Sequence, residues 1–295
     1  MAYVFALSAG LCYAIASVFQ HKVAQAAPSD LSMSPRLLLE VAQHPIWLFG
    51  ITLDIGAYFL EAAALANGSI VLVQTLLVSG LLFALPLSAI GREHRPRRND
   101  WFAAAAVVLG IVVFLSVGDP NDGHSRATTL DWVIAFAVCG SIMVTMVVIT
   151  RHAQPHYRAL GLAVATGASY ALTAALTKQV VGIVERHGFA GLLMHWPTYG
   201  LAVFAIIGLL LNQSAFNAGH LAASLPALAV TNPMLSSILG VALFEETLSA
   251  HGILQYSITA AAVVVMLGGV VRLARSPFVT GEDESWRPAI TPAAP

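Results

Sequence analysis

The chain has 295 residues, of which 58% are hydrophobic and only 10% are charged. Soluble globular domains usually carry about 25% charged residues, so this chain has too few to cover a surface that faces water. The mean hydropathy of +0.78 points the same way and indicates a protein embedded in a lipid bilayer. With a net charge of -1, the chain offers no basic surface for nucleic acid, which we therefore exclude as a partner.

Nine apolar segments are long enough to cross a bilayer core, which is about 30 Å thick and takes roughly 20 helical residues. They are residues 2–20, 46–66, 69–90, 101–117, 130–150, 159–181, 197–218, 221–244 and 253–273. We therefore expect an all-α, polytopic membrane bundle of about nine transmembrane helices. Residues 276–295 are rich in proline and acidic residues and predict a disordered cytoplasmic tail.

The basic residues between the spans predict an orientation. Most of them lie in four regions of the chain, as Lys22, Arg36, Arg92, Arg95, Arg97, Arg98, Arg151, Arg158, Arg272 and Arg275. These residues fall on one side, and Arg126 and Arg186 on the other, if the N-terminus is outside and the C-terminus is cytoplasmic. The larger group would then be cytoplasmic, as the positive-inside rule requires. We expect this multi-pass arrangement in a bacterial cytoplasmic membrane.

Two parts of the chain are similar to each other. Ala6, Gly10, Tyr13, Ala14 and Val23 match Ala163, Gly167, Tyr170, Ala171 and Val180 at a constant spacing. This pattern predicts a first four-span repeat at 1–129, a linking span at 130–150, a second four-span repeat at 151–275 and the tail at 276–295. A single linking span would invert the second repeat in the membrane, an arrangement that is common in transporters.

Three stretches resemble the drug/metabolite transporter superfamily with its EamA-like repeats: residues 7–22, 70–87 and 221–246. In that superfamily a proline-containing helix that runs into an acidic residue typically closes each repeat, and Pro233 with Glu245 is similar to this. The nine spans and the segment Leu72-Val73-Gln74 resemble the NIPA-like magnesium-transporter branch. The resemblance implies a membrane transporter and leaves its substrate open.

Asp54, Tyr58 and Glu61 are the strongest candidate site residues, because they occupy positions i, i+4 and i+7 on one face of the second span. Ionisable side chains inside a bilayer cost a few kcal/mol and usually serve a function. These residues could bind a cation or carry a coupling proton. The structural alternative is that Glu61 reaches the membrane interface while Asp54 bonds a neighbouring helix.

Gln213 and Asn217 share the i, i+4 spacing in the seventh span, and Gln74 and Asn232 are further polar residues within spans. Their amides could orient a substrate in a cavity between the second, third, seventh and eighth spans. They could equally form interhelical hydrogen bonds of modest energy. Lys178 is expected to anchor a helix end at the membrane interface. Glu245 and Glu246, which are consecutive, are expected to mark a membrane boundary.

The preferred function is a secondary carrier or facilitator that moves a small metabolite, drug or cation by alternating access. The sequence contains no enzyme motif, so we expect no catalytic residues and no cofactor, and the question of metal ligands stays open. A non-catalytic subunit of a cell-envelope complex is the main alternative, followed by a membrane-embedded lipid enzyme. A homodimer is compatible with the sequence.

Overall fold

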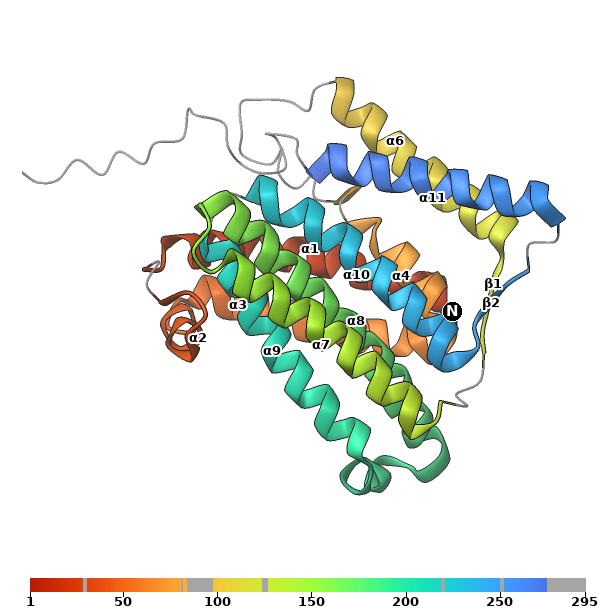
Figure 1. The fold of residues 1–295 in the computed structure, drawn as a ribbon, viewed down its shortest axis with the longest axis horizontal. Coiled ribbons are helices and arrows are strands. Elements are labelled where there is room, and N and C mark those ends of the chain that lie inside the picture. Colours follow the sequence, from red (N-terminus) through yellow and green to blue (C-terminus); the bar gives the residue numbers. More distant parts are fainter. Residues whose placement is uncertain are drawn as a thin grey trace, which may run out of the picture.

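The computed structural model describes residues 1–28, 31–80, 82–83, 98–123, 127–218, 221–249 and 252–274. These residues form a helical bundle, which confirms the predicted all-α class (Figure 1). Eight of the described helices are long and apolar enough to cross a membrane. They are α1 (Ala2–Ala26), α3 (Pro45–Leu65), α6 (Arg98–Val113), α7 (Thr129–Thr150), α8 (Pro155–His187), α9 (Trp196–Ala218), α10 (Leu221–Phe244) and α11 (Gly252–Ala274).

Shorter elements connect the long helices. They are α2 (Pro35–Val41), α4 (Ile70–Leu77), a π-helical turn at Phe114–Gly118, a 3-10 helix at Phe189–Met194, β1 (Pro120–Asn121) and β2 (Thr247–Leu248). The two strands pair in antiparallel fashion and join the chain before α7 to the chain before α11. The predicted third span begins as α4, but residues 81 and 84–97 of that region lie outside the described residues, as does the predicted tail.

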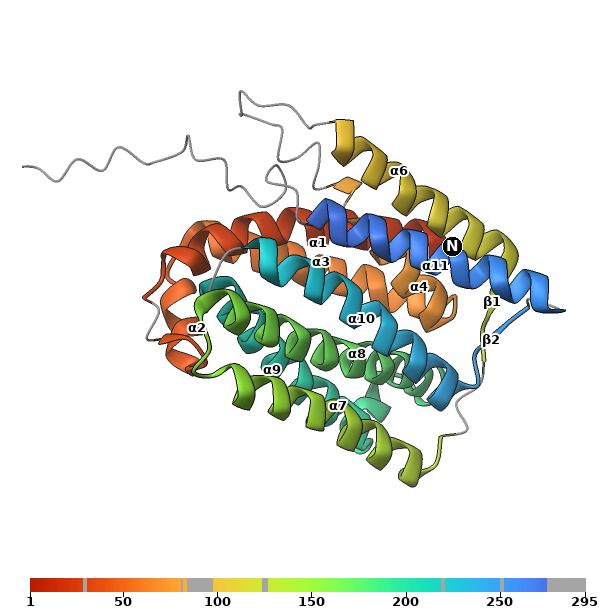
Figure 2. The ribbon, with the colours of Figure 1, turned by 45° about the horizontal axis from the view of Figure 1, so that its top comes forward.

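Helix α8 lies at the centre of the bundle. In its most apolar window 83% of the residues are buried, whereas no other candidate span exceeds 39%. Figure 2 shows α7, α9 and α10 around α8. Small residues such as Ala163, Ala168, Ala171 and Ala175 are buried along α8, and they allow its neighbours to approach closely. Thr166, Ser169 and Thr177 in the middle of α8 are buried as well, so they face protein rather than lipid.

Helix α1 packs against α3 much as α8 packs against α9. Gly10 of α1 lies against Gly80 and the carbonyl of Leu77, at the end of α4. Its sequence match, Gly167 of α8, lies against Thr231 of α10. Gly10 thus allows α1 to approach the end of α4, and Gly167 allows α8 to approach α10.

Helices α6 and α11 lie side by side in both views (Figures 1 and 2). A Cβ atom on Gly110 of α6 would lie 2.6 Å from Cβ of Met266, and one on Gly269 of α11 would lie 2.9 Å from Cγ2 of Val107. Since neither position has room for a side chain, the two helix backbones depend on glycine for their close approach.

Candidate functional site

Helix α3 has two distinct faces. Ile55 and Phe59 are exposed, as expected for side chains that contact lipid. Asp54, Tyr58 and Glu61 are only partly exposed, and each bonds a residue of another helix. The three residues predicted to share a face therefore all turn toward the protein.

Glu61 ends a chain of hydrogen bonds drawn from four helices, which we call the Glu61 chain. The Tyr13 hydroxyl donates to Oε2 of Glu61 at 2.7 Å, and Nε2 of Gln74 donates to Oε1 at 2.8 Å. Asn232 donates to Oε1 of Gln74 at 3.3 Å, and Ser236 donates to Oδ1 of Asn232 at 3.1 Å. Three predicted residues, from α3, α4 and α10, are therefore brought together.

Asp54 ends a second chain, which we call the Asp54 chain. Nε2 of Gln20 donates to Oδ2 of Asp54 at 2.5 Å, and Nε2 of Gln213 donates to Oε1 of Gln20 at 2.6 Å. The indole nitrogen of Trp47 donates to Oε1 of Gln213 at 3.2 Å. Gln20 and Gln213 are fully buried, so the chain runs through the interior between α1, α3 and α9.

The two carboxylates lie in one electrostatic environment. Tyr13 of α1 and Tyr170 of α8 interact electrostatically with each other and with both Asp54 and Glu61. Tyr170 also hydrogen-bonds Asn212 of α9. Within the described part of the chain, neither carboxylate pairs with a lysine or an arginine.

The other two predicted residues make separate contacts. The Tyr58 hydroxyl lies 3.0 Å from Oγ1 of Thr177 on α8. Asn217 donates to the carbonyls of Ala24 at 3.1 Å and Ala27 at 2.9 Å, where α1 ends. Asn217 thus holds a helix terminus and is not part of either carboxylate chain.

Sequence reasoning missed the contributions of α1 and α8. The predicted cavity involved α3, α4, α9 and α10, yet Tyr13 and Gln20 come from α1, while Tyr170 comes from α8. The repeat match pairs Tyr13 with Tyr170. Polar residues at matched positions of the two repeats were therefore the signal that could have found these two tyrosines. Nothing in the spacing pointed to Trp47.

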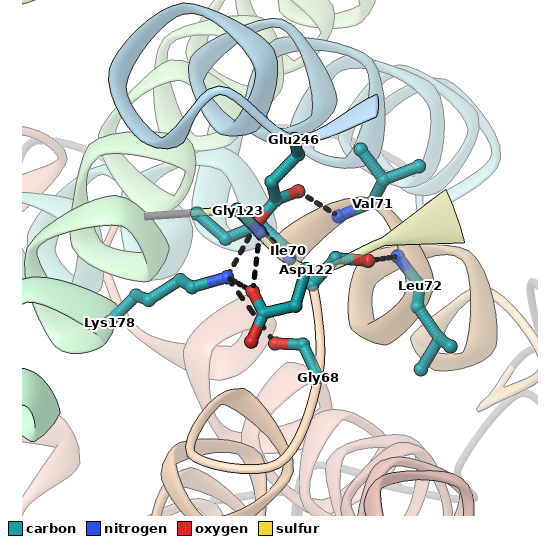
Figure 3. A network of polar contacts seen from close by, with 9 residues as sticks. Gly68, Ile70, Val71, Leu72, Asp122, Gly123, Lys178 and Glu246 are labelled. Atoms are coloured by element: carbon teal, nitrogen blue, oxygen red, sulfur yellow. Dashed lines mark hydrogen bonds and ion pairs between the residues drawn. The ribbon is translucent and has the colours of Figure 1, made fainter. Parts of the chain in front are cut away.

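A third polar cluster, the Lys178 network, consists of Lys178, Glu246, Asp122 and the carbonyl of Gly68 (Figure 3). Nζ of Lys178 lies 2.6 Å from Oε1 of Glu246 and 2.5 Å from Oδ1 of Asp122. The side chains of Lys178 and Glu246 are 9% and 1% exposed. Lys178 is therefore buried in an ion pair, in place of the expected role as an anchor at the membrane surface.

Glu246 also caps the start of α4. Its two carboxylate oxygens accept the backbone N–H groups of Ile70 at 2.7 Å and Val71 at 3.0 Å. Helix N-termini leave such donors unpaired and favour negative charge. Gly240 leaves space for this contact, because a Cβ there would lie 2.5 Å from Oε2 of Glu246. Glu246 is thus an interior residue rather than the solvated boundary that the sequence suggested.

Metal binding finds little support in these clusters. Among the described residues, no three His, Cys, Asp or Glu side chains are grouped so that they could hold a metal ion. The oxygens of Glu61 already accept hydrogens from Tyr13 and Gln74. A carboxylate whose oxygens already accept hydrogen bonds has fewer lone pairs left for a metal ion, which needs several oxygen ligands.

The chain was also compared with known proteins. No family model and no solved structure matches it significantly. It is 30% identical over 276 residues to a Corynebacterium glutamicum protein named "Uncharacterized protein Cgl0250/cg0304". The aligned region covers 94% of this chain and 95% of that protein. The chain therefore belongs to the same family as this Corynebacterium glutamicum protein.

Proposed function

We propose that the protein is an integral membrane transporter, a secondary carrier or facilitator, and that its substrate or its coupling ion is positively charged. The observation that carries the proposal is the environment of Asp54 and Glu61. Both carboxylates lie on the inward face of an apolar helix, and their hydrogen-bond partners are the neutral groups Gln20, Tyr13 and Gln74.

Charge balance is the physical argument. A carboxylate removed from water loses several kcal/mol of hydration, and neutral donors restore only part of this. A proton or a cationic group of a solute would supply the remainder. Carboxylates that face the interior of a membrane bundle are typical of sites that bind such cations or relay protons.

The arrangement of the two halves supports a carrier that works by alternating access. The matched glycines Gly10 and Gly167 make equivalent helix contacts, as expected for two related repeats. The Lys178 network joins α8 and the end of α10 to the turn before α4 and to Asp122. In this proposal the network keeps that end of the bundle closed while the carboxylates are reached from the other end.

We also propose that the chain is related to the drug/metabolite transporter superfamily and that it has the orientation inferred from the loop charges. In that orientation the N-terminus is outside and the C-terminus is cytoplasmic. The Lys178 network would then close the outer end of the pathway, because Glu246 and Asp122 belong to the acidic side of the predicted topology.

The first test is a thermal-shift screen of the detergent-purified protein against divalent cations, amino acids, nucleosides and organic ammonium compounds. Ligand binding raises the apparent stability of the folded state. We expect one cationic class to stabilise the wild type and the Thr52→Val variant, whose change lies on the exposed face of α3. The same ligand should not stabilise Asp54→Asn.

The second test uses proteoliposomes loaded with the ligand found in the screen. Counterflow of labelled ligand should occur with the wild type and Thr52→Val and fall to background with Asp54→Asn. Retention of full counterflow in both Asp54→Asn and Glu61→Gln would show that the site is wrong. No stabilisation by any class would favour a subunit of a cell-envelope complex, which should then co-purify with its partner.

A further inference from the structure

The Asp54 chain has a direction that the ionised Asp54 sets at one end and Trp47 sets at the other, and Trp47 alone maintains this direction when Asp54 is protonated. An indole N–H can only donate a hydrogen bond, so the group facing Trp47 must be an acceptor. That group is Oε1 of Gln213, which leaves the Gln213 amide nitrogen to face Oε1 of Gln20. The Gln20 amide nitrogen then faces Asp54. The orientation of both amides follows from the donor at the end of the chain.

Reversing either amide would be unfavourable. If Gln20 turned over, its carbonyl oxygen would face the carboxylate of Asp54, and its amide nitrogen would face that of Gln213. Two acceptors or two donors in contact inside the protein lose a hydrogen bond and leave polar groups unsatisfied. Trp47 and Gln213 are buried, so water cannot readily replace the missing partner.

The Glu61 chain lacks this constraint. Its far end is the hydroxyl of Ser236, and its other contributor is the hydroxyl of Tyr13. Hydroxyl groups can both donate and accept, so the direction of this chain can reverse when Glu61 is protonated and becomes a donor. Both oxygens of Glu61 already accept a hydrogen bond. By contrast, Oδ1 of Asp54 accepts none from the residues that the structure describes.

We propose that Trp47 is a positioning residue that fixes the direction of the Asp54 chain, so that Oδ2 of Asp54 always accepts from Gln20 and Oδ1 stays available to a cationic group. The role given to Oδ1 rests on the proposed function, whereas the effect of Trp47 on Asp54 does not. Trp47 touches no ligand in this scheme. It acts through Gln213 and Gln20.

Other groups near Asp54 are common to every variant considered below. Tyr13 of α1, Tyr170 of α8 and Glu61 of α3 itself interact with it electrostatically or through one another. Helix α9 contributes the neutral side chains Asn212 and Gln213. Lys178, on α8, is paired with Glu246 and Asp122. A change seen in Trp47→Phe can therefore be assigned to the loss of the indole donor.

The experiment is a pH titration of the full chain by infrared difference spectroscopy. The C=O band of protonated Asp54 is identified by its absence in Asp54→Asn. An ionised Asp54 accepts only, so it holds both amides in their native orientation also in Trp47→Phe. Without the indole donor, however, the amides can turn once Asp54 is protonated and donates to Oε1 of Gln20, so the protonated form is no longer disfavoured. We expect Asp54 to take up its proton with about tenfold higher affinity, so that its band appears at a higher pH than in the wild type. Gln213→Leu removes the next residue of the chain, the one that donates to Gln20, and should raise the pH at which the Asp54 band appears in the same way.

Trp132→Phe is the matched control. Trp132 is also buried and packs against Phe136, Trp196 and Phe244, but it belongs to an aromatic cluster outside the Asp54 chain. Its variant should leave the Asp54 band unchanged. An unchanged band in folded Trp47→Phe and Gln213→Leu would overturn the proposal.

A ligand-binding measurement distinguishes this inference from the proposed function. Each variant is titrated with the cationic ligand from the thermal-shift screen. Weakened binding in Trp47→Phe, together with normal binding in Trp132→Phe, would support both statements. A shifted Asp54 band with no binding of any ligand to the wild type would support the role of Trp47 and contradict the transporter.

Discussion

Lys178 and Glu246 form an ion pair in which Nζ lies 2.6 Å from Oε1, and both side chains are almost completely buried. The same carboxylate binds the first backbone N–H groups of α4 through Ile70 and Val71. One acidic residue thus connects α8 with the beginning of α4. Asp122 also contacts Lys178, but its side chain is 54% exposed.

Removal of the Glu246 charge should destabilise the protein strongly. Glu246→Gln leaves Lys178 buried without its main partner, and breaking a buried pair costs about 3 kcal/mol or more. The α4 terminus also loses a favourable negative charge. We expect a clearly lower midpoint in thermal unfolding of the detergent-purified variant.

Asp122→Asn is the matched comparison, because it changes the exposed partner of the same lysine. An exposed pair contributes about 1 kcal/mol or less, so its midpoint should remain near that of the wild type. The double variant Lys178→Met/Glu246→Gln should be more stable than Glu246→Gln alone, since it leaves no unpaired cation. Equal losses in Glu246→Gln and Asp122→Asn would contradict this account.

The contact between α6 and α11 makes a prediction about two adjacent glycines. In Gly269→Ala the new Cβ would lie 2.8 Å from the carbonyl of Ala103 and 2.9 Å from Cγ2 of Val107. Such overpacking typically costs about 1–3 kcal/mol. In Gly268→Ala the new Cβ meets no atom within 4 Å. Thermal unfolding should show a loss for Gly269→Ala only, and similar midpoints would refute close packing at this pair.

Much of the fold could be predicted because the length of an apolar segment is set by the bilayer. This constraint located the spans that became α3, α7, α9 and α11 nearly to the residue. It could not predict that α8 continues to His187, since the polar end of that helix needs no lipid. It also missed α2, whose start is marked only by a local signal, the Ser34 cap before Pro35.

The candidate site was predictable only within a single helix. The i, i+4, i+7 spacing of Asp54, Tyr58 and Glu61 fixes their common face whatever surrounds it. Their partners depend on which helices meet in space, and spacing along the chain carries no such information. This is why Gln20 and Trp47, which control the surroundings of Asp54, were not among the predicted residues.

Asn217 should prove structural rather than substrate-binding. Its amide donates to the carbonyls of Ala24 and Ala27 at the end of α1, where carbonyl groups have no partner further along the helix. Asn217→Ala should therefore cost about 2 kcal/mol of stability for the two lost bonds. The stabilisation by a cationic ligand, measured by thermal shift, should stay as large as in the wild type. A loss of that ligand response would return Asn217 to the site.

Tyr13 and Tyr170 provide the last prediction, because they occupy matched positions of the two halves but bond different groups. Tyr13 donates to the carboxylate of Glu61, whereas Tyr170 bonds the neutral amide of Asn212. Hydrogen bonds to charged groups contribute about 1.5–3 kcal/mol and neutral ones about 1 kcal/mol. Tyr13→Phe should therefore lower the unfolding midpoint more than Tyr170→Phe.

The Glu61→Gln background tests the cause of that difference. With the charge removed, Tyr13→Phe should cost no more than Tyr170→Phe does, because the Tyr13 bond becomes neutral as well. The midpoints of the two single variants and of the two double variants with Glu61→Gln give this comparison directly. If Tyr13→Phe remains the more damaging change without the Glu61 charge, then packing of the ring, and not the bond to Glu61, is what stabilises this part of the bundle.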